Sequence, residues 1–313
     1  MEAHAQLIPQ EWKLMQNKNI LVTGVTGLLG QALIGSVPAG DRVIGVSRGV
    51  DSRVVNGSLE LVKTDVTDPE AVNRIFDRFE IDVAIHAAGE GSVDAVERDP
   101  ILGRLSIVQG AENLANISKK HGVQALYIST NAVFSGNEAP YAEASETRPL
   151  TLYGHLKKEA EIAFLESDDR CSVVRPILMY GWPLHGQRTN PVAFTVSQLR
   201  ANQEIMMVND VWENPLYNKQ AAEAIWQVTK KEVAGVIHLA GQTRLNRYEL
   251  AVATAKAFRL DPDLIKEVDS SFFPALTPRP RDTTFRIDRM IDRLSMQPLS
   301  INEGLKRMVA DES

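Results

Sequence analysis

Tyr153 and Lys157 stand four residues apart in the segment Tyr-Gly-His-Leu-Lys, and together they could move a proton. On a helix, residues at this spacing share one face. A phenol ionises near pH ~10, and a neighbouring ammonium group lowers its pKa by stabilising the tyrosinate. Such a phenol can donate a proton to a carbonyl that receives a hydride. We therefore take the two residues as a candidate catalytic pair; the alternative is a plain pair on a helix surface.

A hydride donor could bind at the glycine-rich segment after the first apolar run, residues 19–23, which is typical of a strand buried on both faces. Gly24 permits a tight turn, Gly27 lets the backbone approach a pyrophosphate, and Gly30 lets the next helix pack on the sheet. The start of that helix offers free N–H groups to phosphates. The spacing favours a dinucleotide turn over a merely structural one. The predicted cofactor contacts here are Gly24, Thr26, Gly27, Leu28, Leu29 and Gly30.

The end of the second apolar run, residues 42–47, bears on the choice between NAD and NADP. An acidic residue there would bind the ribose 2′-hydroxyl group, whereas a basic one favours the 2′-phosphate. The run ends in Ser47 and Arg48, and Asp41 lies at its opposite end. Because a guanidinium group forms paired hydrogen bonds with phosphate, we expect NADP(H) to be favoured over NAD(H). A solvent-exposed arginine is the alternative.

Two further segments follow predicted strands and could contact the cofactor. Asp65 and Val66 could meet the adenine ring. Residues 86–89, His-Ala-Ala-Gly, place small side chains where the chain must pass close to the cofactor. Ordinary turn chemistry is the alternative for both segments. The contacts predicted from them are Asp65, Val66, Ala87, Ala88 and Gly89.

Strands alternate with helices along the chain, which indicates a parallel sheet with right-handed crossovers. The fold class expected is therefore α/β: a Rossmann-type doubly wound parallel sheet with a smaller C-terminal substrate-binding lobe. We expect the Rossmann domain over residues 1–181, with 1–17 as an N-terminal extension. Residues 182–313 would form mainly the lobe, with a segment near 210–240 returning to the sheet. The predicted strands are 19–23, 42–47, 59–63, 82–86, 123–129, 172–178 and 235–239. The predicted helices are 28–34, 100–121, 153–165, 192–200, 221–230, 248–258 and 301–309, and residues 65–79 should form a turn and a helix that starts near Asp68-Pro69.

Composition excludes several functional classes. The formal net charge of −6 offers no basic cluster for nucleic acid or an anionic membrane. The single cysteine, Cys171, rules out an internal disulfide and disfavours a cysteine zinc site. The histidines lack metal-ligand spacing, so we predict no metal. No apolar stretch approaches the ~20 residues of a membrane-spanning helix, and the N-terminus does not look like a secretory signal. We expect a cytoplasmic protein.

Several motifs together resemble the extended short-chain dehydrogenase/reductase superfamily. They are the glycine turn at 23–30, His-Ala-Ala-Gly at 86–89, Ser129-Thr130, the 153–157 pair, and Arg-Pro-Ile-Leu-Met-Tyr-Gly at 175–181. Finer features are similar to the dTDP-4-dehydrorhamnose reductase subfamily. They are Ser-Thr-Asn-Ala-Val-Phe-Ser-Gly at 129–136, Val-Asp-Ala-Val-Glu at 93–97, Gly-Val-Ile-His-Leu-Ala-Gly at 235–241 and Arg-Pro-Arg-Asp at 279–282.

The resemblance implies roles for individual residues. Thr130 would hydrogen-bond the substrate carbonyl or the tyrosine, and Tyr153 would donate the proton. Lys157 would bind the nicotinamide ribose and tune Tyr153. The superfamily's Arg-Pro element lies beside the nicotinamide. Ser129, Arg175 and Pro176 therefore join the predicted cofactor contacts, together with Tyr153 and Lys157.

Two departures from the family pattern concern the same region. Asn131 and Ala132 replace an expected Asp-Tyr pair, so substrate contacts there would differ. Ile107 stands where the superfamily often has an asparagine that supports a proton relay.

Substrate contacts are expected mainly after residue 181. Arg279 and Arg281 flank a proline and could clamp a diphosphate, or could be a solvated pair. Trp182 could stack on a base or sugar, or could pack inside the lobe. Trp212 lies where the subfamily carries a substrate-lobe loop. The substrate-binding residues predicted are Val133, Phe134, Trp182, Trp212, Arg279 and Arg281.

The leading hypothesis is a reductase of a keto group, on a 4-keto-6-deoxy nucleotide sugar or a similar ketone, that uses NADPH. A nucleotide-sugar epimerase or dehydratase would share the fold and cofactor, although Asn131-Ala132 disfavours a dehydratase. The third hypothesis is a non-catalytic NADP-binding regulatory subunit, since the subfamily includes that of methionine adenosyltransferase. A homodimer would follow the family's common habit.

Overall fold

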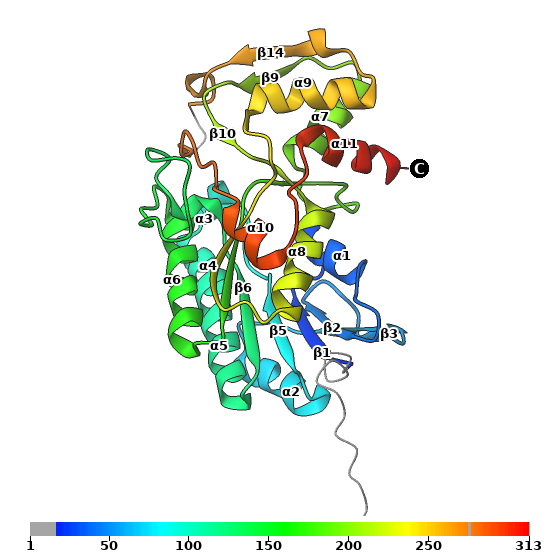
Figure 1. Cartoon of the computed structure of the whole chain (residues 1–313), viewed down its shortest axis with the longest axis vertical. Helices are drawn as coiled ribbons and strands as arrows, with labels where there is room; N and C mark the ends of the chain where they lie inside the picture. The colour runs from blue at the N-terminus through cyan, green and yellow to red at the C-terminus, as the bar shows by residue number, and fades with distance from the viewer. Residues whose placement is uncertain (1–16, 275–276, 313) are drawn as a thin grey trace, which may run out of the picture.

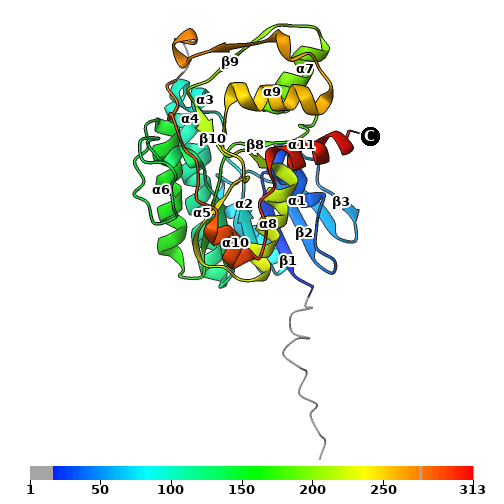
Figure 2. The ribbon, with the colours of Figure 1, turned by 45° about the horizontal axis from the view of Figure 1, so that its top comes forward.

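The fold is described from a computed structural model, which covers residues 17–274 and 277–312 (Figure 1). The expected N-terminal extension, 1–17, therefore lies outside the described residues except at its last position. A large sheet stands between two layers of helices, and a smaller lobe sits over one end of the sheet (Figure 1, Figure 2). The expected fold class is confirmed.

The main sheet has the strand order β12-β7-β6-β5-β1-β2-β4-β3. Each neighbouring pair is parallel except β3 and β4, which form an antiparallel edge. The order reverses between β1 and β5, the point at which ligands bind in folds of this kind. The strands are β1 Asn19–Thr23, β2 Arg42–Ser47, β3 Arg53–Asn56, β4 Leu59–Lys63, β5 Val83–His86, β6 Gln124–Ile128, β7 Ser172–Pro176 and β12 Gly235–Leu239.

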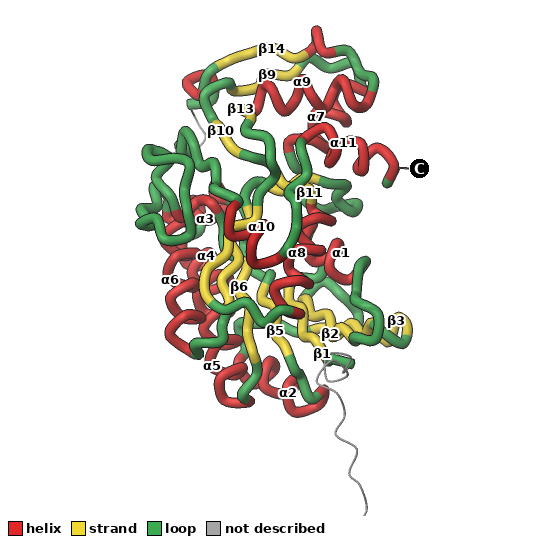
Figure 3. The backbone as a smooth tube through the Cα atoms, viewed as in Figure 1, coloured by secondary structure: helices red, strands yellow, loops and turns green. Residues whose placement is uncertain are grey.

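Helices cover both faces of this sheet (Figure 3). One layer contains α1 Leu28–Ile34, α8 Asn218–Lys230 and α10 Asp288–Leu294, and the other contains α2 Pro69–Phe79, α5 Gly110–His121 and α6 Leu152–Ser167. Their ends follow ordinary capping chemistry. The Asp68 carboxylate accepts hydrogen bonds from the first backbone N–H groups of α2, and Gly122 ends α5 in the left-handed conformation.

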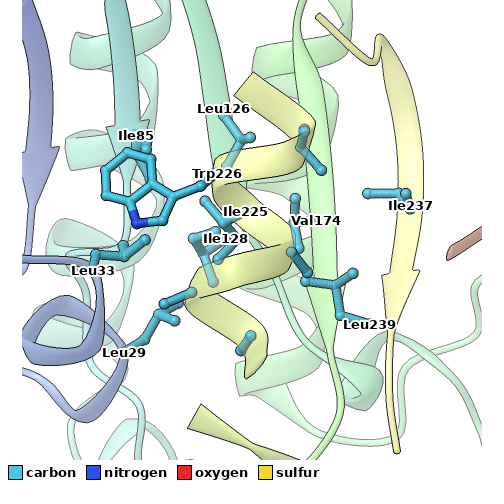
Figure 4. Close-up of a cluster of buried hydrophobic side chains, with 14 of the residues drawn as sticks. Leu29, Leu33, Ile85, Leu126, Ile128, Val174, Ile225, Trp226, Ile237 and Leu239 are labelled. Atoms are coloured by element: carbon cyan, nitrogen blue, oxygen red, sulfur yellow. The ribbon is translucent and has the colours of Figure 1, made fainter. Parts of the chain in front are cut away.

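The core beneath α8 brings together both halves of the chain. Trp226 and Ile225 of α8 lie beside Leu29 and Leu33 of α1 and against β-strand side chains such as Val174 (Figure 4). Burial of each large apolar side chain contributes about 1.5–3 kcal/mol. The chain after residue 210 is therefore part of the main sheet's core through α8 and β12.

The smaller lobe contains α7 Pro191–Arg200, α9 Arg247–Phe258 and α11 Ile301–Ala310 beside a parallel pair, β9 Ile205–Val208 and β14 Ile265–Val268 (Figure 1). Short strand pairs connect the lobe to the sheet. They are β8 Met179–Tyr180 with β11 Leu216–Tyr217, and β10 Trp212–Glu213 with β13 Leu245–Asn246. Two single 3₁₀ turns, η4 Pro262–Leu264 and η5 Ser270–Phe272, complete it.

The helix predicted over residues 100–121 is three joined segments: α4 Pro100–Arg104, the π-helical η2 Leu105–Gln109, and α5. A separate helix, α3 Val93–Arg98, precedes them and was not predicted. The edge strand β3 was also missed. Its four residues are all exposed, so they carry no apolar alternation.

Within residues 17–274 and 277–312, no helix has the length and apolar character needed to cross a membrane. In the same part of the chain, no group of three His, Cys, Asp or Glu side chains is arranged to hold a metal ion.

Candidate active site

A cleft of about 280 Å³ lies where the carboxyl ends of β1, β2, β4 and β5 meet. Many of the predicted cofactor contacts line it: Gly24, Thr26, Gly27, Ser47, Arg48, Asp65, Val66, Ala87, Ala88 and Gly89. The sequence reasoning missed Val46, Thr64, Thr67, Glu90, Leu102 and Ser106, which line the same cleft. The first four adjoin predicted contacts in sequence, so extending each segment by a residue would have found most of them.

The glycine turn fits closely against the segment after β5. Gly24 has a φ of +72°, and a Cβ added there would lie 2.6 Å from the Ala87 carbonyl oxygen. The Thr23 hydroxyl accepts hydrogen bonds of 3.1 Å from the backbone N–H groups of both Ala87 and Ala88. The two walls of the cleft are thus held together by β1 itself. A side chain at position 24 would force them apart.

His86 supports this junction from within the core. Its Nδ1 atom lies 3.0 Å from the Thr23 hydroxyl oxygen. Burial, followed by the nearby charge of Lys157, lowers the pKa of His86 to about 3. The imidazole therefore stays neutral at physiological pH and acts as a hydrogen-bond partner of Thr23.

Arg48 and Asp65 both line the cleft. Burial by itself would raise the pKa of Asp65, but hydrogen bonds from Thr67 and the positive charge of Arg48 lower it. The hydroxyl groups of Ser47 and Thr26 lie 3.1 Å apart beside them. This end of the cleft therefore presents a guanidinium group, two hydroxyl groups and an ionised carboxylate.

Tyr153 is the second residue of α6, and three contacts fix the start of that helix. The Thr151 hydroxyl accepts a hydrogen bond from the Gly154 N–H, and Glu97 of α3 accepts one of 2.7 Å from the Leu152 N–H. A Cβ at Gly154 would overlap the Ala132 carbonyl oxygen. The glutamate of the Val-Asp-Ala-Val-Glu motif thus positions the helix that carries the tyrosine.

The structure corrects the expected pKa of Tyr153. Burial raises the pKa of the phenol. A hydrogen bond with Thr130 and the positive charge of Arg188 act in the opposite direction without overcoming burial, and Glu90 adds to the increase. Tyr153 is therefore firmly protonated at neutral pH, the state that a proton donor requires.

Lys157 lies one turn further along α6 and is 7% exposed. Its Nζ atom donates a 2.7 Å hydrogen bond to the Ile128 carbonyl oxygen at the end of β6 and lies 4.4 Å from the centre of the Tyr127 ring. Burial lowers the pKa of Lys157 to about 7, while the charge of Glu161 acts to raise it. The lysine is thus held against the strand beside which Thr130 stands.

A buried ion pair lies behind Lys157. Arg175 of β7 donates hydrogen bonds of 2.8 and 2.6 Å to the two carboxylate oxygens of Glu161. The Ser129 hydroxyl donates to the same carboxylate. Ser129 and Arg175, both predicted cofactor contacts, are therefore bound to Glu161, and Pro176 is buried within β7. Sequence reasoning did not identify Glu161, although it stands four residues after Lys157.

The departures from the family pattern have a structural context. Asn131 begins the 3₁₀ turn η3 Asn131–Val133, and its amide donates hydrogen bonds to Glu213 (3.0 Å) and Thr283 (2.7 Å). An aspartate at this position would face the Glu213 carboxylate and repel it. Ile107 is buried in η2, so its neighbourhood is apolar.

Three of the predicted substrate contacts pack against other parts of the protein. Val133 and Phe134 have no exposed surface, and the Phe134 ring stacks on Tyr141 at 4.2 Å. Their side chains therefore belong to the core. Trp182 packs within the lobe: its indole N–H donates to the Met308 carbonyl oxygen and its ring lies against Phe258.

The remaining predicted substrate residues lie between the sheet and the lobe. Arg279 forms a 2.7 Å ion pair with Asp94 of α3 and also donates to the Thr277 carbonyl oxygen. Arg281 is exposed. Trp212 is half-buried beneath the guanidinium of Arg244, 4.0 Å from its ring centre. The Asp94 contact shows that the motifs at 93–97 and 279–282 bind each other.

Comparisons with known proteins agree with this geometry. The family model described as RmlD substrate binding domain matches residues 18–313. Methionine adenosyltransferase 2 subunit beta of Pongo abelii is 30% identical over 272 residues, which is 84% of this chain and 79% of that protein. A dTDP-4-dehydrorhamnose reductase of Aggregatibacter actinomycetemcomitans is 26% identical over 304 residues, which is 93% of this chain and 98% of that protein.

A solved structure extends the likeness to the fold. The dTDP-4-dehydrorhamnose reductase of Bacillus anthracis str. Ames, in complex with NADP, superimposes with a TM-score of 0.84 and 23% sequence identity, covering 95% of this chain and all of that one. The expected resemblance is confirmed, and with it the enzyme class, NAD(P)-dependent oxidoreductases of the extended short-chain dehydrogenase/reductase superfamily. Within that superfamily, the chain belongs to the RmlD substrate-binding domain family.

Proposed function

We propose that the chain is an NADPH-dependent reductase of a keto group on a nucleotide sugar, with a 4-keto-6-deoxy sugar as the favoured substrate. The observation that carries the proposal is the placement of Tyr153 and Lys157. Both lie on α6, and Lys157 is anchored to the end of β6, next to Thr130 and close to the cleft. Reductases of this kind are among the relatives that match nearly the whole chain.

The cleft fits a nicotinamide dinucleotide. Gly24 and Gly27 both line the cleft, and glycines at these two places of the turn suit the close approach of a pyrophosphate. Arg48 supports the preference for NADP, because its guanidinium suits the 2′-phosphate. Asp65 and Val66 would face the adenine, with the Val66 carbonyl held by Asn113. When bound, the cofactor supplies the hydride.

The chain's own residues would handle the proton. Tyr153 is protonated at neutral pH, and the Thr130 side chain lies close enough to lower its pKa, so the two hydroxyl groups would share one carbonyl oxygen of the substrate. Tyr153 would release its proton to that oxygen as negative charge develops there. Lys157, when charged, would stabilise the resulting tyrosinate and hold the nicotinamide ribose.

The experiment follows NADPH absorbance with a panel of 4-keto nucleotide sugars and compares wild type with Tyr153→Phe. We expect turnover with at least one substrate and a loss of about 100-fold or more in kcat for the variant, the range of a removed general acid. Unchanged binding of NADPH by Tyr153→Phe serves as the folding control. Equal turnover by the two proteins would refute the assigned role of Tyr153.

A second candidate function is that of a non-catalytic NADP-binding subunit. The 30% identity with a methionine adenosyltransferase subunit favours it, as do Asn131, Ala132 and Ile107, which depart from the family pattern. This candidate predicts tight NADPH binding without turnover by the isolated protein. An epimerase would instead convert its substrate without net consumption of NADPH.

A further inference from the structure

The loop 182–190 joins β8 to α7 and touches both walls of the cleft. Gln187 donates a hydrogen bond from its side-chain amide to the Thr26 carbonyl oxygen, in the glycine turn. Its neighbour Arg188 donates one of 2.7 Å to the carbonyl oxygen of Gly91, just beyond the segment that follows β5. The loop therefore connects the segment after β1 with the segment after β5, and a dinucleotide would lie between these two segments.

Internal contacts give this loop a defined shape. The Gln187 side chain accepts a 2.8 Å hydrogen bond from the Leu184 N–H, and the Gln187 N–H donates to the Leu184 carbonyl oxygen. Asn190 donates 2.8 Å to the Gly181 carbonyl oxygen and caps α7. Because both ends and the middle are tied, the position of Arg188 is set by the loop.

Arg188 also acts on the catalytic centre. Its positive charge lowers the pKa of Tyr153, against the larger effect of burial, so the guanidinium lies close enough to influence the phenol. Glu90, which lines the cleft, is the opposing charge. A guanidinium group carries five N–H donors in a fixed fork, and the hydrogen bond to Gly91 uses only part of it.

One of the two arginines that the sequence analysis assigned to a diphosphate, Arg279, is already bound elsewhere. The Arg279 guanidinium group donates hydrogen bonds to the Asp94 carboxylate and to the Thr277 carbonyl oxygen. Arg188, in contrast, is exposed and has a neutral carbonyl as its hydrogen-bond acceptor. A carbonyl is a weaker acceptor than an anion, so a phosphate oxygen would compete well for the guanidinium.

We propose that Arg188, carried on the loop 182–190, binds a diphosphate group at the mouth of the cleft. This inference rests on the proposed function, in which two molecules bring a diphosphate: the cofactor and the nucleotide sugar. The shared chemistry is a pair of adjacent phosphates, which a guanidinium fork recognises by parallel hydrogen bonds. The loop, already tied to both walls of the cleft, would cover the bound diphosphate from the lobe side.

The test measures binding by titration calorimetry, with NADP⁺ alone and then with dTDP in saturating NADP⁺. The proteins are wild type, Arg188→Ala, Arg188→Lys and Arg170→Ala. Arg170 is an exposed arginine at the amino end of β7, bound to Asp168, so its variant matches the change in charge away from the cleft. Neither titration requires turnover, so the result stands apart from the success or failure of the reductase assay.

We expect Arg188→Ala to raise one of the two dissociation constants by about ten- to a hundredfold, as the loss of a charge-assisted pair of hydrogen bonds does. Arg188→Lys should fall between, because it keeps the charge but loses the fork. A change for NADP⁺ assigns the diphosphate to the cofactor; a change confined to dTDP assigns it to the nucleotide sugar. If Arg188→Ala stays within about threefold of wild type and of Arg170→Ala for both ligands, the proposal is overturned.

Discussion

Replacement of Glu161 by glutamine should destabilise the protein strongly. The side chains of Glu161 and Arg175 are only 4% and 5% exposed, and their two hydrogen bonds measure 2.6 and 2.8 Å. Breaking a buried pair of this kind costs about 3–5 kcal/mol, because the remaining charge stays buried without its partner. Arginine cannot escape by losing its proton. Glutamine preserves the volume, so the loss is electrostatic and not a cavity effect.

Chemical unfolding at pH 7 measures this loss, and a melting experiment should show a decrease in Tm of roughly 6–15 °C. The matched control is the double variant Glu161→Leu with Arg175→Met, which replaces both charges by apolar groups of similar size. The single variants Glu161→Leu and Arg175→Met each lower the free energy of unfolding. The double variant should be more stable than the sum of these two losses predicts, by about 1–3 kcal/mol. A loss below about 1 kcal/mol for Glu161→Gln, with additive effects in the double variant, would refute the reasoning.

The same variant has a kinetic consequence. Glu161 raises the pKa of Lys157, which burial brings down to about 7. Without the carboxylate, Lys157 loses its proton at lower pH. The alkaline decline of kcat for ketone reduction should therefore shift to lower pH in Glu161→Gln. A merely structural role for Glu161 would leave the profile in place.

Three further variants test other parts of the site. Gly154→Ala should lower kcat with little change in NADPH affinity, since its Cβ would overlap the Ala132 carbonyl oxygen and push α6 outward; unaltered kinetics would contradict that packing. Lys157→Met should be more stable than wild type near pH 7, by about 1.4 kcal/mol for each unit of lowered pKa. The pKa of Lys157 is ~10.4 in the unfolded chain and about 7 in the folded protein, so the stability of wild type rises with pH between these two values. Unfolding experiments should therefore show the stability advantage of Lys157→Met becoming smaller as the pH rises through this range. Arg48→Ala should weaken NADPH binding about ten- to a hundredfold and NADH binding far less; equal losses for both cofactors would remove the assignment to the 2′-phosphate.

The main sheet and its cofactor cleft could be predicted from the sequence because each depends on local signals. Continuous apolar runs define β1 and β5, and the glycine spacing after β1 leaves few alternatives to a dinucleotide turn. The helix α6 follows from the spacing of Tyr153 and Lys157 together with its place in the chain. These features need no knowledge of distant contacts.

Other parts depend on partners far away in sequence. Arg279 contacts Asp94, and Asn131 contacts Glu213 and Thr283, so neither role can be inferred from neighbours along the chain. The pKa of Tyr153 was predicted from one adjacent charge, but burial decides its direction. Contacts between distant residues and the burial of a side chain are known only once the whole fold is known.

The central claim is that the Tyr153 and Lys157 site reduces a carbonyl on a nucleotide sugar with a hydride from NADPH. The most direct test is a single turnover with NADPH that carries deuterium on the transferring face, followed by mass spectrometry of the sugar product. We predict one deuterium on the former carbonyl carbon with wild type, and no labelled product with Tyr153→Phe in the same time. Products without deuterium, or no product from protein saturated with NADPH and the substrate panel, would contradict the claim.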